Sequence, residues 1–342
     1  MKPSTNPLDL VFSPTEIGTI GRNYLEYRRT EQGKGIPLYI PALDYNPITG
    51  KGFLPVLSGE IIALIGRPGN GKTGFMMRWA RTRARILQRA IATGGAAEER
   101  IVVYTTLEQS VEELHAFHVA AETGVSITTM AYGTFSDEQW QKVQAVSAKR
   151  SVMPLWFIGH SIARRAKRPT LTIDTLSAAL DGIEKWDGGD CTRKIDMLFI
   201  DYLQRFPTPE RAESKTVAMS DTYDRLKNAA LALGCAVIVG VQAKREVDDR
   251  RVPIPGMEDG QWTSNIEQTS DGVLSVVRPR HYRHEGHEFD GVIVEGSAQM
   301  IVSCLKRKLG PANFKKWIDF DVRYNSLNKA EVKYSESEDE NV

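Results

Sequence analysis

GRPGNGKT, the stretch from Gly66 to Thr73, decides the fold, and it lies between an apolar run at 61–65 and a helix-like stretch at 74–80. It matches the phosphate-binding pattern G-x-x-x-x-G-K-[ST] in the strand, loop and helix setting that this pattern requires. Glycines let backbone N–H groups curl around phosphate oxygens, and the N-terminus of the next helix adds a favourable dipole. An ordinary glycine-rich turn does not need the Lys-Thr pair after its last glycine. The loop therefore predicts a nucleoside triphosphate site contacted by Gly66, Arg67, Pro68, Gly69, Asn70, Gly71, Lys72, Thr73 and Gly74.

Three further apolar runs end in polar side chains. The runs at 101–107, 195–200 and 236–241 are followed by Glu108, Asp201 and Gln242. In open α/β sheets, ligands bind beyond the carboxyl ends of the strands, so these side chains are expected to meet one nucleotide. Asp201 fits the Walker B carboxylate that holds Mg²⁺ beside the hydroxyl of Thr73. Taken alone, a residue such as Glu108 would more often be a charge at a helix N-terminus.

Composition limits the class of protein. The 342 residues are 41% hydrophobic and 25% charged, as in an ordinary globular protein, and the net charge is +1. Nucleic-acid binding would therefore need a local basic surface. Cys191, Cys235 and Cys304 are far apart and without metal spacing, which is typical of reduced thiols in the cytosol. The sequence shows neither the apolar core of a secretory signal nor a run long enough for a membrane helix, so we expect a cytoplasmic protein without membrane contact.

The chain is expected to divide into an N-terminal arm at 1–34, an α/β domain at 35–327 and an acidic disordered tail at 328–342. The arm should hold a short amphipathic helix that begins after Ser13, with Glu16 completing a capping box. This helix packs either on its own domain or on a neighbouring subunit. In the α/β domain we predict helices over 111–150, 172–186 and 217–233, and further strands at 155–158, 272–277, 291–295, 299–305 and 317–322.

Several charged segments allow two interpretations. The arginines of the helix after the loop are spread around it, which favours a solvated face over a nucleic-acid stripe; they are Arg78, Arg81, Arg83, Arg85 and Arg89. The basic cluster at 164–168 is either a solvated loop or a phosphate contact. The three histidines at 281, 284 and 287 favour a surface hairpin over a zinc site, because no carboxylate or cysteine partners them.

A set of motifs in a fixed order adds a family resemblance. Together with the loop, the chain contains YTTLE at 104–108, LFIDYLQ at 198–204, VQAKR at 241–245, SNIEQTSD at 264–271 and LKRKLGP at 305–311. These motifs resemble the RecA-like ATPase domain of the bacterial replicative DNA helicases, the DnaB family. The lead-in GIPLYIPALDY at 35–45 is also similar to the entry into that domain. The resemblance covers about 35–327 and implies a RecA-like P-loop NTPase with a mostly parallel central sheet flanked by helices.

The resemblance also implies an activity and an assembly. Members form hexameric rings that bind ATP and Mg²⁺ between subunits and move along single-stranded DNA. Transferred onto this chain, Lys72 binds phosphate, Glu108 polarises the attacking water and Gln242 senses the γ-phosphate. Lys306 and Lys308 would reach into the site of the neighbouring subunit. The helix near 13–29 corresponds in position to a linker helix that packs on that neighbour.

Three departures from the family pattern are visible. Too few residues precede the core to form the family's N-terminal helical domain, so we expect that domain to be missing. Lys308 stands where the family has an arginine, with Arg307 beside it; a lysine lacks the planar fork of arginine, so either hydrolysis is slower or Arg307 substitutes. In the DNA-contacting loop, Gln261 and Trp262 replace an arginine and an acidic residue, and Trp262 either stacks on a base or packs within the loop. The other candidate DNA contacts are Lys244, Arg245, Arg250 and Arg251.

The leading hypothesis is a DnaB-like, ATP-hydrolysing hexameric DNA helicase or translocase, acting with replication, mobile-element or defence partner proteins. The alternative hypothesis is a RecA-like regulatory or assembly ATPase that forms oligomers and recruits partners without unwinding DNA.

Overall fold

The computed structural model describes residues 11–30, 32–94, 99–164, 170–186, 193–208, 212–261, 265–296 and 298–327. Trp262, Cys191, most of the basic cluster at 164–168 and the acidic segment 328–342 lie outside these ranges. The chain divides into two compact units, Met1–Ile36 and Pro37–Val342.

The first unit contains one long helix, α1 (Pro14–Arg28), and a short 3₁₀ turn, η2 (Gln32–Lys34). The side chain of Ser13 caps α1, and the carboxylate of Glu16 binds back to the Ser13 backbone, as the sequence predicts. No residue of α1 is buried, and Ile17, Ile20 and Leu25 are exposed. The apolar face of this helix therefore finds no partner among the described residues of its own unit.

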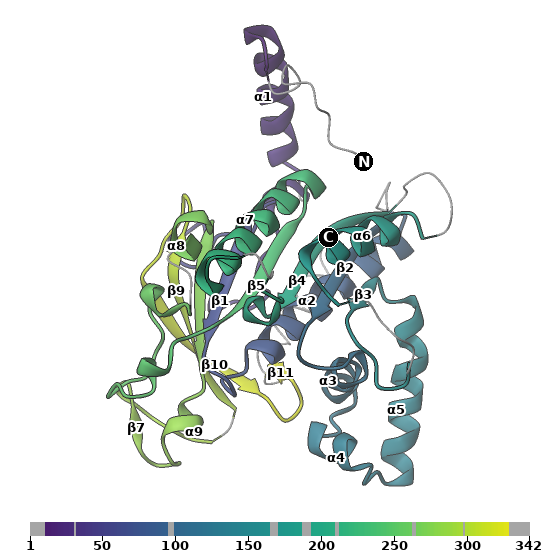
Figure 1. Ribbon diagram of the computed structural model, residues 1–342. Coiled ribbons are helices and arrows are strands. Elements are labelled where there is room, and N and C mark those ends of the chain that lie inside the picture. Colours follow the sequence, from purple (N-terminus) through teal and green to yellow (C-terminus); the bar gives the residue numbers. More distant parts are fainter. Residues whose placement is uncertain are drawn as a thin grey trace. The chain divides into compact units, whose positions relative to one another are not determined.

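The second unit is built on a nine-stranded sheet, and the prediction of a mostly parallel central sheet flanked by helices is confirmed (Figure 1). In spatial order the strands are β11 (Ser326–Leu327), β10 (Phe314–Asp321), β9 (Gln299–Arg307), β6 (Gly272–Val277), β1 (Ile61–Gly66), β5 (Ala236–Gln242), β4 (Arg193–Asp201), β2 (Glu99–Thr106) and β3 (Leu155–Ile158). The pairings from β6 to β3 are parallel, and those from β6 to β11 are antiparallel. A separate small hairpin joins β7 (Glu288–Phe289) and β8 (Val292–Ile293).

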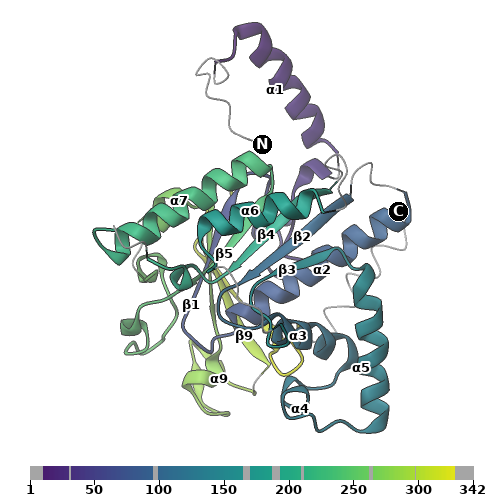
Figure 2. The ribbon, with the colours of Figure 1, turned by 45° about the vertical axis from the view of Figure 1, so that its right-hand side comes forward.

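The helices of this unit are α2 (Lys72–Ala92), α3 (Val111–Thr123), α4 (Ile127–Tyr132), α5 (Asp137–Lys149), α6 (Ile173–Glu184), α7 (Lys215–Leu233), α8 (Asn265–Thr269) and α9 (Pro279–Tyr282). Short 3₁₀ turns lie at η3 (Arg150–Val152), η4 (Leu203–Arg205), η5 (Arg245–Val247) and η6 (Met257–Asp259). Figure 2 shows α6 and α7 side by side across the sheet, with α3, α4 and α5 grouped beyond its β3 edge. Serine N-caps start α3, α4, α5 and α7, and Gly234 ends α7 in a left-handed conformation.

The core forms because the central strands are apolar on both faces. Ile61, Ala63 and Ile65 of β1 pack in one cluster with α6 and α7. On the opposite face, Gly240 of β5 approaches Met76 of α2, where a Cβ would lie 3.1 Å from the methionine methyl group. A strand buried on both faces reads as a continuous apolar run, which is what 61–65 and 236–241 show. This two-sided packing fixes where β1 ends and where the loop after it begins.

The prediction that the arginines of α2 form a solvated face is wrong for Arg78, Arg81 and Arg83, whereas Arg85 and Arg89 are exposed. Arg78 and Arg81 are only 7% and 4% exposed. Arg78 donates to the carbonyl of Leu38 at 2.5 Å, and Arg81 donates to the carbonyl of Asn325 at 2.9 Å. Arg83 forms a two-pronged ion pair with the buried Asp196. Arg78, Arg81 and Arg83 thus hold the lead-in segment, the turn between β10 and β11, and β4 against α2, so their role is structural.

The C-terminal half differs from its prediction in detail. The strand expected over 291–295 is reduced to the two residues of β8, and the segment between the strands expected at 272–277 and 291–295 contains α9 and β7. The last long strand starts at Phe314, earlier than the predicted 317. Among the helices that the structure describes, none is long and apolar enough to cross a membrane.

Candidate nucleotide-binding site

The phosphate-binding loop connects β1 to α2. Gly69 and Gly71 have φ angles of 76° and 84°, a left-handed conformation that favours glycine. At Gly71 a Cβ atom would also lie 2.6 Å from the methyl group of Met300. The loop can therefore curl tightly and turn its backbone towards the start of α2 at Lys72.

Lys72 is folded back onto the loop. Its Nζ donates to the carbonyl oxygens of Gly66 at 2.7 Å and Arg67 at 3.1 Å, and the residue is 8% exposed. Burial lowers the pKa of Lys72 from 10.5 to about 8, against the opposing charges of Asp201 and Glu108. The ammonium is thus held at the centre of the loop by weak backbone acceptors that a phosphate oxygen can replace.

Asp201, at the end of β4, lies beside the loop and is 4% exposed. The hydroxyl of Tyr104 donates to its Oδ2 at 2.8 Å. Burial raises the pKa of Asp201, while hydrogen bonds from Thr73 and Tyr104 and the charge of Lys72 oppose that rise. Thr73 and Asp201 therefore touch, as the Walker B pattern predicts.

This hydroxyl and carboxylate fit Mg²⁺, which prefers oxygen ligands and keeps several of its waters. Within the described part of the chain, no group of three or more His, Cys, Asp or Glu side chains gathers to hold a metal by protein ligands alone. A site of this kind suits an ion that is held mainly by phosphate oxygens and water.

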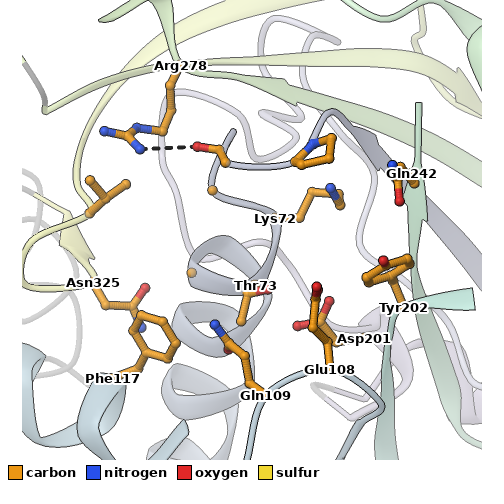
Figure 3. Close-up of a pocket in the computed structure, with 15 residues that line it drawn as sticks. Lys72, Thr73, Glu108, Gln109, Phe117, Asp201, Tyr202, Gln242, Arg278 and Asn325 are labelled. Carbon is orange, nitrogen blue, oxygen red and sulfur yellow. Dashed lines mark hydrogen bonds between the residues drawn. The ribbon is translucent and has the colours of Figure 1, made fainter. Parts of the chain in front are cut away.

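A cavity of about 350 Å³ opens in front of the loop (Figure 3). Glu108, Asp201 and Gln242 all line it, so the carboxyl ends of β2, β4 and β5 meet at one place, as expected for parallel neighbours. Glu108 follows β2 and points into the cavity beside Asp201. Its Oε1 accepts a hydrogen bond from Arg205 at 2.9 Å, and the two side chains are 47% and 50% exposed.

Gln242 is joined to the segment that resembles a DNA-contacting loop. The Gln242 backbone N–H donates to Oε1 of Gln204 at 3.0 Å, and Nε2 of Gln204 donates to the carbonyl of Gln261 at 3.0 Å. The N–H of Gln261 in turn donates to the carbonyl of Gln242 at 2.9 Å. The end of β5 and residue 261 therefore belong to one hydrogen-bonded group.

Two side chains of the loop point away from the cavity and brace it. Arg67 pairs with Asp248 at 2.7 Å, and Nδ2 of Asn70 donates to the hydroxyl of Tyr282 at 3.0 Å. That hydroxyl donates to Asp248 at 2.9 Å, which closes the network. Oδ1 of Asn70 also accepts from the backbone of Arg278. Of the predicted contacts, Arg67 and Asn70 are thus placed to offer backbone atoms to a phosphate while their side chains fix the loop.

The three predicted intersubunit cations lie at the opposite ends of the strands from the cavity. Arg307 and Lys306 pair with Gly272 and Val273 at the start of β6, and Gly272 pairs with Ile62 near the start of β1, whereas the cavity lies beyond the end of β1. Arg307 is 6% exposed. Its guanidinium binds Glu60 and the carbonyls of residues 54, 55 and 271. Lys308, by contrast, has a side chain that is 61% exposed, and its Nζ lies 3.5 Å from Oδ1 of Asp271.

The candidate DNA contacts differ in how free their charges are. Arg250 is committed to Asp259 through two hydrogen bonds of 2.7 Å. Lys244 donates to the carbonyl of Glu258 at 2.8 Å. Arg245 and Arg251 are exposed, and Trp262 lies outside the described residues.

Sequence reasoning missed several residues of the site. Arg205 directly follows the LFIDYLQ motif. Tyr104 is the first residue of YTTLE, and Gln109 directly follows that motif. Their positions in or beside these motifs could therefore have identified all three residues. Three other side chains of the cavity wall carry no such signal, since they come from segments far apart in the sequence: Phe117, Arg278 and Asn325.

The chain resembles known proteins over most of its length. Residues 49–326 match the family model of the DnaB-like helicase C terminal domain. A replicative DNA helicase DnaB of Leifsonia xyli subsp. xyli is 25% identical over 304 residues, which are 88% of this chain and 58% of that protein. The chain spans about half the length of the curated helicases it matches.

Two solved structures have the same fold. An ATPase domain superimposes with a TM-score of 0.72 at 17% identity, covering 92% of this chain and 99% of that domain. A DnaB-like replicative helicase, described with its interactions with primase, gives a TM-score of 0.69 at 17% identity, covering 93% of this chain and 67% of that one. Because the family model matches well over half of the residues, the chain belongs to the family of the DnaB-like helicase C-terminal domain.

Proposed function

We propose that this chain is the ATP-hydrolysing, Mg²⁺-dependent subunit of a DnaB-like hexameric ring helicase that moves along single-stranded DNA. One observation carries the proposal. The carboxyl ends of three parallel strands bring Glu108, Asp201 and Gln242 to one cavity in front of Lys72 and Thr73. Two carboxylates, an amide, an ammonium and a hydroxyl around a phosphate-binding loop are the groups that phosphoryl transfer to water requires.

Each group has a separate task. The backbone N–H groups of the loop and Nζ of Lys72 bind the phosphate oxygens and offset their charge. Thr73 and Asp201 hold Mg²⁺, which when bound offsets the charge that builds up on the phosphate oxygens. Glu108 orients the attacking water and accepts its proton, once the carboxylate is free of Arg205. Gln242 donates its side-chain amide towards the terminal phosphate.

Assembly completes the site. Lys306 and Lys308 lie beside the starts of β6 and β1, whereas the cavity of their own subunit lies beyond the end of β1. Their charges can therefore act on a nucleotide only if it is bound by a neighbouring copy, which supports hydrolysis at subunit interfaces. The exposed apolar residues of α1 support docking of that helix on the neighbour, because an apolar helix face normally packs against something.

The path from nucleotide to DNA runs through Gln204. It holds the end of β5 and the carbonyl of Gln261 together, and residue 261 belongs to the segment that corresponds to the DNA-contacting loop of the family. A shift of Gln242 on hydrolysis would be passed to this loop directly. The exposed Arg245 and Arg251 supply charge for the DNA backbone, so binding should weaken steeply as salt rises.

The test is strand displacement on a forked DNA duplex, run beside measurements of ATPase activity with and without single-stranded DNA at two salt concentrations. We expect unwinding, stimulation of the ATPase by DNA, and a smaller stimulation at the higher salt. Particle symmetry with and without ATP is measured on the same samples. If the protein forms oligomers with ATP, but these oligomers do not unwind DNA and their ATPase is not stimulated by DNA, the helicase proposal is overturned. The protein would then be a regulatory assembly ATPase.

A further inference from the structure

The cavity has a second end that the phosphate chemistry does not use. Figure 3 shows Lys72 and Thr73 at its centre, with Glu108, Tyr202 and Gln242 on one side. On the other side lie Phe117 of α3 and Asn325 of the turn between β10 and β11. A triphosphate whose last phosphate faces Glu108 and Gln242 would therefore direct its nucleoside towards Phe117 and Asn325.

Asn325 is unusual in this wall. It is 0% exposed, yet neither Oδ1 nor Nδ2 of its amide has a hydrogen-bond partner. A buried amide with no partner is costly, so such groups call for an explanation, and an absent ligand is one. Oε1 of Gln109 and Nε of Arg278, on the same wall, are also buried and without a partner.

The backbone holds Asn325 in place for such a contact. Its φ angle is 50°, and its carbonyl accepts a hydrogen bond of 2.9 Å from the buried Arg81. The amide abuts the first turn of α2, where a Cβ on Gly74 would lie 2.9 Å from Oδ1. The missing side chain at position 74 thus leaves the amide beside the loop residues that follow the phosphate cradle.

We propose that Phe117 and Asn325 form the nucleobase subsite and that Asn325 selects adenine over guanine, an inference that rests on the proposed function. An asparagine amide offers one donor and one acceptor. Adenine presents the matching pair, an acceptor at N7 and a donor at its 6-amino group, whereas guanine presents two acceptors on that edge. Nδ2 of Asn325 would donate to N7, and Oδ1 would accept from the amino group, while the ring of Phe117 stacks on the base.

The first experiment compares nucleotides on the full-length wild-type protein. Dissociation constants are measured for ATP, GTP, 7-deaza-ATP, which lacks the N7 acceptor, and inorganic tripolyphosphate, which lacks a base. We expect ATP to bind at least about tenfold more tightly than GTP, and 7-deaza-ATP to bind several-fold more weakly than ATP. Equal dissociation constants for ATP, GTP and 7-deaza-ATP overturn the inference, and this test uses the wild-type protein alone.

The second experiment repeats the series on Asn325→Leu. ATP affinity should fall about tenfold, the preference for ATP over GTP should disappear, and tripolyphosphate should bind as in the wild type. The matched control is Asn313→Leu, because Asn313 also has a positive φ, 57°, but is exposed in the turn between β9 and β10. If Asn325→Leu lowers tripolyphosphate and ATP affinity equally, Asn325 supports the loop and does not read the base.

A third variant avoids the strained position altogether. Phe117→Ala should weaken ATP and GTP by the same factor and leave tripolyphosphate unchanged, because stacking does not distinguish the bases by hydrogen bonds. No change in either nucleotide would remove Phe117 from the subsite and overturn the proposal. Failure of the proposed function looks different: a wild-type protein that binds neither ATP nor tripolyphosphate has no phosphate site at all, and the nucleobase subsite falls with it.

Discussion

The two ends of the cavity in front of the phosphate-binding loop differ in how many of their polar groups have a hydrogen-bond partner within the chain. At the phosphate end, Lys72, Asp201 and Glu108 all have partners within the chain. At the opposite end, Asn325 and Gln109 bury polar atoms that have none. The chain therefore pairs the charged groups of the phosphate end by itself and leaves polar atoms of the opposite end without a partner. This difference teaches that the phosphate end rests in a closed arrangement that a ligand must rearrange, whereas the other end is already arranged for a ligand.

The largest expected effect on ATP hydrolysis comes from Glu108, the carboxylate placed to accept a proton from water. Glu108→Gln keeps the size of the side chain but cannot accept a proton from water. We expect kcat for ATP hydrolysis to fall by about 10²- to 10⁴-fold, the range for loss of a general base. Steady-state kinetics and a nucleotide-binding assay measure it, and the dissociation constant for ATP should change little.

Asp201→Asn is the comparison for that variant. It removes a charge from the same cavity, but from the residue placed to hold Mg²⁺, so the Mg²⁺ concentration needed for half-maximal activity should rise. Glu108→Gln should leave this Mg²⁺ requirement where it is. A Glu108→Gln protein with wild-type kcat would show that another group activates the water.

The sequence predicted the phosphate end because its signals are local. A loop pattern, and polar residues directly after three apolar runs, place Lys72, Asp201 and Gln242 without any knowledge of packing. The opposite end could not be predicted. Phe117 and Asn325 belong to a helix and a turn from distant parts of the chain, and neither residue type in its local pattern indicates a ligand. The prediction for Arg78 and Arg81 was wrong for a related reason: spacing around a helix does not reveal that Leu38 and Asn325 bring carbonyls to these two arginines.

The second prediction compares how one polar group at each end contributes to the free energy of unfolding of the nucleotide-free protein. Tyr104→Phe removes the hydroxyl that donates to buried Asp201, which leaves a carboxylate oxygen unpaired. We expect the free energy of unfolding to fall by about 1–3 kcal/mol. Gln109→Met removes an amide whose Oε1 has no partner, so the free energy of unfolding should stay the same or rise.

Chemical denaturation of both variants, without nucleotide, measures this pair. If Gln109→Met destabilises the protein as much as Tyr104→Phe does, the proposed difference between the two ends is wrong. In that case the amide of Gln109 has a stabilising partner, such as an ordered water, and the opposite end is as complete as the phosphate end.

The third prediction uses the pKa of Lys72. Burial lowers this pKa to about 8 in the nucleotide-free site, and a bound triphosphate should raise it, because an opposite charge favours the charged ammonium. Below about pH 8 the ammonium is already charged and affinity is independent of its titration. Above that pH, binding must take up a proton, so affinity falls as pH rises. At pH 9 the affinity for ATP should be about tenfold weaker than at pH 7.

Isothermal titration calorimetry in two buffers of different ionisation enthalpy counts the proton taken up at pH 8.5. Lys72→Arg is the control, since an arginine stays charged throughout this range and should bind ATP with little pH dependence. If the Lys72→Arg protein loses affinity between pH 7 and pH 9 as steeply as the wild type does, another group is responsible.

The smallest expected effect tests whether the closed state of the phosphate end restrains hydrolysis. Arg205 holds Oε1 of Glu108 at 2.9 Å, and the carboxylate must leave this partner to orient water. An exposed ion pair contributes about 0.2–1 kcal/mol, so Arg205→Ala should raise the ATPase rate without DNA by at most about fivefold. Lys142→Ala is the matched control, because it breaks an exposed pair with Glu138 on α5, away from the cavity. A lower rate in Arg205→Ala would mean that Arg205 helps the reaction, and that the pairing seen here belongs to the active arrangement of Glu108.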